Sequence, residues 1–200
     1  MSGTFPVSPG ARDTELTSIQ PELTDISQSG KRQSSIIAGH LWEVTCNYPP
    51  MLRDEFAPLF AFSISQRGDD FQITLPNFNV PRGVATGTPL VDGIHAAADS
   101  AIAIDGWTAS ITGILKAGSL IKFASHSKVY MTTADVDSGA SPGLSSVPII
   151  PPLIEALADN EAVTINNVPI TMAFKNGGVQ EFKTKIPGVS SFAIDLVESI

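Results

Sequence analysis

Residues 39–76, GHLWEVTCNYPPMLRDEFAPLFAFSISQRGDDFQITLP, change their hydrophobic period twice, and these changes decide the fold. Residues 41–48 are rich in β-branched and aromatic side chains, which favours a strand, and the two prolines at 49 and 50 end it. From residue 52 the apolar spacing becomes that of a helix, which the stretch predicts over 52–66, and a strand follows at 71–76. The predicted core of this helix and its sheet is Trp42, Phe56, Leu59, Phe60, Ile64 and Phe71.

The rest of the chain reads as short strands. The 16 glycines and 15 prolines among 200 residues interrupt helices and mark turns, so the predicted fold class is mainly β (α+β). Residues 77–106 contain Asp-Gly pairs at 92 and 105 and predict loops and short hairpins. Residues from 107 predict a small antiparallel barrel or sandwich. A hairpin at Asn176-Gly177-Gly178 and a last strand predict a C-terminal part that closes the fold.

Composition excludes several classes of protein. The formal charge of −8 argues against nucleic acid as a partner, because such a surface repels phosphates. The single Cys46 cannot form a disulfide within the chain. The N-terminus carries no basic segment followed by an apolar run, and no stretch is long and apolar enough for a membrane span. We therefore expect no membrane insertion and synthesis in a reducing cytoplasm.

Residues that carry chemistry are scattered. His40, His95 and His126 each stand beside Gly, Ala or Ser, which predicts ordinary surface histidines. Asp135 and Asp137 lack the other ligands of a calcium loop and predict a turn. No set of nucleophile, base and orienting group is present, so we expect no enzyme activity, no cofactor and no metal. Trp42 and Trp107 would form a sugar platform if both were exposed, but packing in a core or an interface is favoured.

The 39–76 stretch resembles bacteriophage tail structural proteins of the distal tail, minor tail and tail-tube families. In these families a strand near a Trp is followed by an acidic-started helix, a glycine turn and a strand that ends in Pro. The matching positions are Trp42, Arg53, Glu55, Phe56, Ala61, Phe62, Arg67, Gly68, Phe71 and Pro76. Leu52 departs from the pattern, since such helices often begin with a Thr or Ser cap. The resemblance implies a tail-type β-sandwich over residues 15–106, with the helix flanking one sheet.

The second half is similar to a β-module that recurs in virion structural proteins. The matching segments are ILKAGSLIKFASHSKVYMTTADVDS (114–138) and IIPPLIEALADNEAVTIN (149–166), with Ser119 where the module usually has Asp. The implied organisation is an inserted module at 107–168 and closing strands of the sandwich at 169–200.

The resemblance implies a structural role in the virion tail. The expected function is a homo-oligomeric ring, most often a hexamer, at the distal tail end, where it connects the tail tube to the tip or baseplate. The expected partners are tail tube, hub and tip proteins, and the protein would be made in the bacterial host cytoplasm. A baseplate component of a contractile tail and a host-glycan-binding tail module remain alternatives.

Residues 1–14 have too little apolar surface to fold alone and predict an extended N-terminal arm. Phe5 and Val7 lie beside Pro6 and Pro9, which stiffen the segment and give it two apolar anchors. With the implied ring, these anchors are expected to bind a neighbouring subunit.

Overall fold

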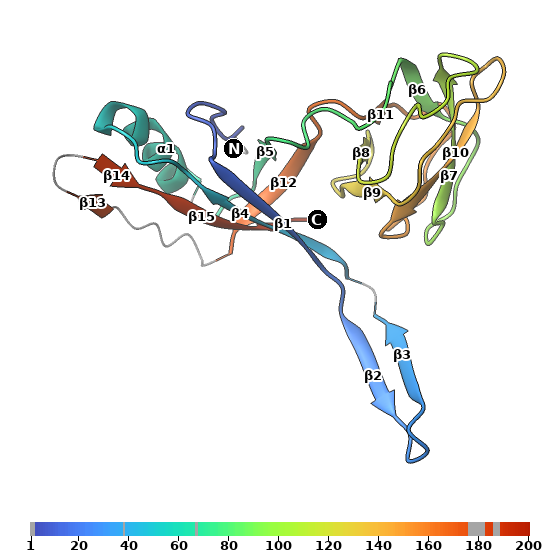
Figure 1. Ribbon diagram of the computed structural model, residues 1–200, viewed down its shortest axis with the longest axis horizontal. Helices are drawn as coiled ribbons and strands as arrows, with labels where there is room; N and C mark the ends of the chain where they lie inside the picture. Colours follow the sequence, from blue (N-terminus) through green and yellow to red (C-terminus); the bar gives the residue numbers. More distant parts are fainter. Residues whose placement is uncertain (1–2, 38, 67, 176–182, 186–188) are drawn as a thin grey trace. The chain divides into compact units, whose positions relative to one another are not determined.

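A computed structural model of the chain describes residues 3–37, 39–66, 68–175, 183–185 and 189–200. The described elements are antiparallel strands and one α-helix, which confirms the mainly β fold class (Figure 1). The chain divides into two compact units. Unit 1 contains residues 1–70 and 172–198, and unit 2 contains residues 71–171 and 199–200.

The main sheet has five strands in the order β1-β4-β15-β12-β5. Their bounds are β1 Asp13–Ile19, β4 Leu41–Asn47, β15 Ala193–Glu198, β12 Pro169–Phe174 and β5 Phe71–Thr74. The division between the units falls within β12 and directly before β5. Two-stranded ribbons are formed by β2 (Glu22–Ile26) with β3 (Arg32–Ile36) and by β13 (Lys183–Lys185) with β14 (Val189–Ser191). The described strands of unit 1 do not include a second large sheet that would complete the predicted sandwich.

Strand β4 lies at the centre of unit 1 because its side chains alternate between two environments. Trp42, Val44 and Cys46 are buried, and the residues between them are partly exposed. β4 pairs with β1 along its whole length, from Asp13 opposite Asn47 to Ile19 opposite Leu41. On its other edge it pairs with β15. A period of two with one apolar face is what such a half-buried strand requires.

Helix α1 spans Arg53–Ser65, in agreement with the prediction over 52–66. Leu52 is its N-cap residue and has no side-chain acceptor. The Glu55 carboxylate instead accepts a hydrogen bond from the Leu52 backbone N–H at 3.1 Å, which satisfies one donor at the helix start. Pro58 lies inside the helix without ending it. Arg67 and the predicted hairpin at 176–178 lie outside the described residues.

The buried face of α1 is narrower than its sequence suggested. Phe56, Leu59 and Ser63 are buried, and the ring of Phe56 meets that of Phe192 edge-on at 5.4 Å. Phe60 is half-buried, whereas Ile64 is 44% exposed, so its prediction as a core residue is wrong. Consecutive residues differ by about 100° around a helix. Ser63 faces the core, and its hydroxyl donates to the Leu59 carbonyl at 2.8 Å. The next residue, Ile64, therefore points away from the core, toward the exposed side of the helix.

The predicted N-terminal anchors behave differently from each other. Phe5 is buried within its own chain, where its ring lies 5.3 Å from that of Phe62 and 6.4 Å from that of Tyr48. Its prediction as an anchor on a neighbouring subunit is therefore wrong, because α1 and the residues after β4 already provide an aromatic pocket. Val7 is 77% exposed. The prediction for Val7 remains untested.

Unit 2 contains a six-stranded sheet in the order β11-β8-β9-β10-β7-β6. An antiparallel bridge between Leu90 and Ala162 joins its two edges, because Leu90 belongs to β6 and Ala162 directly precedes β11. The sheet therefore closes into a small barrel around a core that includes Ile102, Phe123 and Val147. The bounds are β6 Gly87–Val91, β7 Ala101–Trp107, β8 Leu120–Phe123, β9 Tyr130–Thr132, β10 Ser145–Ile150 and β11 Val163–Thr164.

The barrel begins earlier in the chain than the module predicted from residue 107, because β6 and β7 belong to it. The predicted turn at Asp105 is wrong. Asp105 and Gly106 lie inside β7, where the pairing with β6 shifts register between Gly87 and Leu90. Gly106 has φ of +73°, and a Cβ there would lie 2.2 Å from the Thr88 carbonyl oxygen. The glycine thus forms a bulge in a strand and does not form a hairpin turn.

Candidate assembly interface

The most exposed part of unit 1 is the β2–β3 hairpin. Every residue of both strands is exposed, and the hairpin projects from the end of the β1–β4 pair (Figure 1). Its strands pair from Glu22 opposite Ile36 to Ile26 opposite Arg32, and the Ser27 N–H donates to the Lys31 carbonyl at 3.0 Å across the tip. The hairpin is regular in its backbone, but no side chain in its strands is buried.

Both faces of this hairpin carry large apolar side chains. Ile26 and Ile36 share one face, and Leu23 lies on the other. Ile36 is 69% exposed, and Leu23 and Ile26 are almost equally exposed. A two-stranded hairpin is at best marginally stable in water when nothing packs on it. Apolar side chains on both faces therefore indicate a surface that a partner covers.

The root of the hairpin is held firmly. The Ser18 hydroxyl and His40 Nε2 lie 2.9 Å apart across the β1–β4 end, and the His40 ring packs edge-on against Trp42 at 4.6 Å. Next to them, the Gln20 amide donates to the Ile37 carbonyl at 2.7 Å. His40 and Trp42 are both buried. The hairpin therefore extends from a packed base.

Helix α1 has a second apolar surface, on the side that does not face the core. Ala57, Pro58, Ala61 and Ile64 are all exposed and fall on one side of the helix, and we refer to them as the outward face of α1. Asp54 and Glu55 are exposed at the N-terminal end of the helix. A helix that is apolar on two sides is typical of one packed between two layers. The outward face is thus a second candidate contact surface of unit 1.

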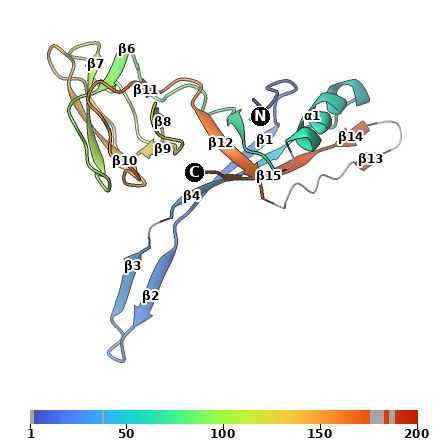
Figure 2. The ribbon, with the colours of Figure 1, turned by 180° about the vertical axis from the view of Figure 1, so that it is seen from behind.

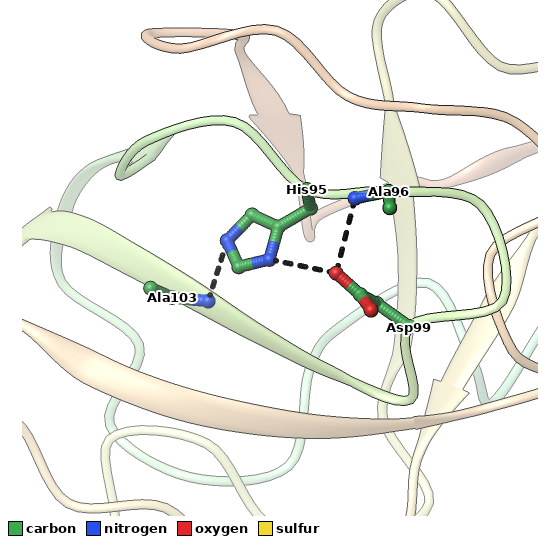
Figure 3. A network of polar contacts seen from close by, with 4 residues as sticks. All are labelled: His95, Ala96, Asp99 and Ala103. Carbon is green, nitrogen blue, oxygen red and sulfur yellow. Dashed lines mark hydrogen bonds and ion pairs between the residues drawn. The ribbon is translucent and has the colours of Figure 1, made fainter.

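The histidines are not ordinary surface residues. His40 and His126 are buried, and only 14% of the His95 side chain is exposed. In the network of Figure 3, His95 Nε2 accepts a hydrogen bond from the Ala103 N–H at 3.1 Å, and His95 Nδ1 lies 3.4 Å from an Asp99 carboxylate oxygen. The same oxygen accepts from the Ala96 N–H at 3.1 Å. Both ring nitrogens are engaged, so His95 braces residues 95–103 and has no nitrogen available as a general base.

His95→Leu is expected to lower the stability of unit 2. The substitution leaves the Ala103 N–H without its acceptor, and an unsatisfied buried donor costs about 1 to 3 kcal/mol. Urea unfolding of the purified variant measures this loss. Asp99→Asn is the matched control, since the amide oxygen still accepts from the Ala96 N–H. Equal stability of His95→Leu and the wild type would refute the bracing role.

A second polar cluster in unit 2 surrounds His126. Its Nδ1 lies 2.7 Å from the Tyr130 hydroxyl, which also accepts from the Ile154 N–H at 3.3 Å. Nearby, burial acts to raise the pKa of Glu161, but hydrogen bonds from the Ser125 hydroxyl and backbone outweigh it and leave the pKa lowered. These contacts join the 125–130 turn to the segments that follow β10.

The remaining candidates for chemistry are structural. Asp135 accepts from the Ala117 N–H at 3.0 Å and Asp137 from the Gly113 N–H at 2.6 Å, so these carboxylates join two distant segments beside the Leu115–Val136 bridge and do not form the predicted local turn. Within the described ranges, no group of three or more His, Cys, Asp or Glu side chains could hold a metal ion. Trp107 is buried, so it cannot offer a sugar platform. No described helix is long and apolar enough to cross a bilayer.

Cys46 is expected to resist alkylation in the folded protein. Burial raises the pKa of its thiol to about 11, although a hydrogen bond with Thr14 acts in the opposite direction. The reactive thiolate is therefore scarce at pH 8, and the sulfur is inaccessible. We expect reaction with iodoacetamide to be at least about 100-fold slower than in urea-unfolded protein. Because the folded pKa is raised, the stability contributed by the protonated thiol is complete below pH 9 and is lost as the pH rises toward 11.

Comparison with known proteins places these observations in a family context. Residues 77–168, which include all six barrel strands, match the family model described as distal tail protein pb9, B domain. The chain is also 27% identical over 170 residues to distal tail protein pb9 of Escherichia phage T5, an alignment that covers 84% of this chain and 81% of that protein. The chain is therefore a bacteriophage tail structural protein that resembles the distal tail family.

Proposed function

We propose that the protein forms a homo-oligomeric ring, a hexamer as the tail-protein resemblance implies, at the distal end of the virion tail. There it would connect the tail tube to the tip or baseplate proteins. The observation that carries this proposal is the similarity to distal tail protein pb9, which extends over 84% of the chain. The role needs no catalysis, cofactor or metal, and synthesis in the host cytoplasm precedes assembly.

The free sheet edges of the two units support different roles for them in such a ring. The barrel of unit 2 is closed by the bridge between Leu90 and Ala162, so its strands offer no long free edge to a neighbour. Unit 1 has an edge strand in β1, both edges of the β2–β3 hairpin and the apolar outward face of α1. Self-assembly through unit 1, with unit 2 serving as a module for other tail proteins, follows from this difference.

The mass of the purified protein in solution tests the ring. A monomer has a mass of 21.0 kDa, so light scattering coupled to size exclusion separates a monomer from a hexamer without ambiguity. Electron microscopy of tails that carry a tagged copy tests the position, with label expected at the distal end. Label along the tube, or at the head-proximal end, would contradict the proposed place in the tail.

A further inference from the structure

We propose that the β2–β3 hairpin of one copy docks on the outward face of α1 in the next copy. The inference deepens the proposed ring, on which it rests, by naming the two surfaces that meet. It follows from their places at opposite ends of unit 1, from their apolar character, and from the basic tip of the hairpin and the net acidic start of the helix.

The two surfaces cannot meet within one chain. β4 begins at Leu41, beside the hairpin, and ends at Asn47, shortly before α1. The seven-residue β1–β4 ladder, about 23 Å long at 3.3 Å per residue, therefore separates them. Figures 1 and 2 agree in showing the hairpin directed away from the helix. A contact between such ends is head-to-tail, which is the type of contact that closes into a ring.

The two surfaces are matched in length and in chemistry. A helix of 13 residues is about 20 Å long, and the five-residue strands of the hairpin extend about 17 Å. The hairpin offers Leu23, Ile26 and Ile36, whereas the helix offers mainly small side chains, such as Ala57 and Ala61, that allow close approach. Large side chains facing small ones give the interdigitation that a packed interface requires.

Charge favours this pairing over contact between two like surfaces. Lys31 and Arg32 lie at the hairpin tip, whereas α1 begins with the exposed Arg53 followed by the exposed Asp54 and Glu55, a net acidic start. With two acidic and two basic side chains, residues 20–37 are neutral, so they contribute nothing to the net charge of −8. Two copies of an acidic chain repel each other, so a neutral element with a basic tip approaches a helix start of net negative charge more favourably than an acidic surface would.

Disulfide trapping tests the contact. Ser34→Cys, on the hairpin face of Ile26 and Ile36, is made in one copy and Ala61→Cys in a second copy of different mass, both with native Cys46, which is buried. After mild oxidation of the mixed oligomer, we expect a disulfide-linked heterodimer. The control pairs Ser34→Cys with Ser146→Cys, an exposed position on β10, and is expected to give at least tenfold less product.

Aspartate substitutions on each surface, with a control in unit 2, give a second measurement of self-association. Ile36→Asp is expected to weaken self-association at least tenfold, and Ala61→Asp is expected to do the same from the helix side. Ile94→Asp in unit 2, where the isoleucine is 83% exposed, is expected to leave it unchanged. An oligomer that forms without the hairpin–helix disulfide overturns this contact and leaves the ring intact. A chain that is monomeric in solution and in assembled tails overturns both.

Discussion

Phe56→Ala is expected to lower the free energy of unfolding of unit 1 by about 3 to 5 kcal/mol, the range for removing a fully buried aromatic ring. Phe56 is 1% exposed, stacks on Phe60 with ring centroids 5.4 Å apart and meets Phe192 edge-on. The truncation would leave a cavity between α1 and the segment that leads into β15.

Urea unfolding followed by Trp42 fluorescence measures the effect on unit 1. Trp107 is replaced by Phe in all samples, so that unit 2 contributes no tryptophan fluorescence. This replacement breaks no hydrogen bond among the described residues, because the buried indole N–H of Trp107 has no partner there. Ile64→Ala is the control on the same helix and is expected to cost less than about 1 kcal/mol, since Ile64 is largely solvated. Equal losses in the two variants would contradict the assignment of the core face.

The helix and its neighbouring strands were predictable because their signals are local. Pro49 and Pro50 end a strand, and the spacing of Phe56 and Leu59 fixes a helical period. Which flank of the apolar stripe faces the core was not predictable. The Ser63 hydroxyl donates to a backbone carbonyl of its own helix, so this polar side chain can be buried at low cost. The sequence pattern alone favours Ile64 as the buried residue.

The hairpin and the first barrel strands were harder to predict for two physical reasons. Short strands are predicted in this part of the chain, but only the pairing shows that Leu23, Ile26 and Ile36 lie on both faces of an isolated ribbon. In the β6–β7 region the Asp-Gly pairs at 92 and 105 predict loops and short hairpins. In the structure Gly106 forms a bulge opposite Thr88, which is 18 positions away along the chain, and local sequence patterns do not reveal such a partner.

The candidate site residues divide in the same way. His40 and His95 stand beside small residues that predict exposed turns, yet both are buried or nearly so by partners from other segments, such as Ser18 and Ala103. The docking surfaces carry no catalytic pattern that a sequence motif could reveal. Exposed apolar side chains signal an interface only once the fold shows that nothing in the same chain covers them.

Excising the hairpin is expected to abolish self-association while unit 1 stays folded. In this variant residues 21–39 are replaced by Asn-Gly, which forms a two-residue turn suited to the antiparallel β1–β4 pair. The bond between Ser18 and His40 is retained. The strands that are removed bury no side chain of their own, so the unfolding free energy should change by less than about 1 kcal/mol.

The loss of association should be large because Leu23, Ile26 and Ile36 of the hairpin are among the most exposed aliphatic side chains described in unit 1. Burying a leucine or isoleucine side chain contributes about 1.5 to 3 kcal/mol, so losing several of them weakens binding by at least about 100-fold. Light scattering over a range of concentrations measures the shift to monomer. A second variant with serine at Leu23, Ile26 and Ile36 keeps the backbone and separates side-chain packing from edge pairing. If the excised protein retains the mass of the wild-type oligomer, the ring contact lies elsewhere. The outer edge of β1 then becomes the surface to test, since β1 is an edge strand of the main sheet.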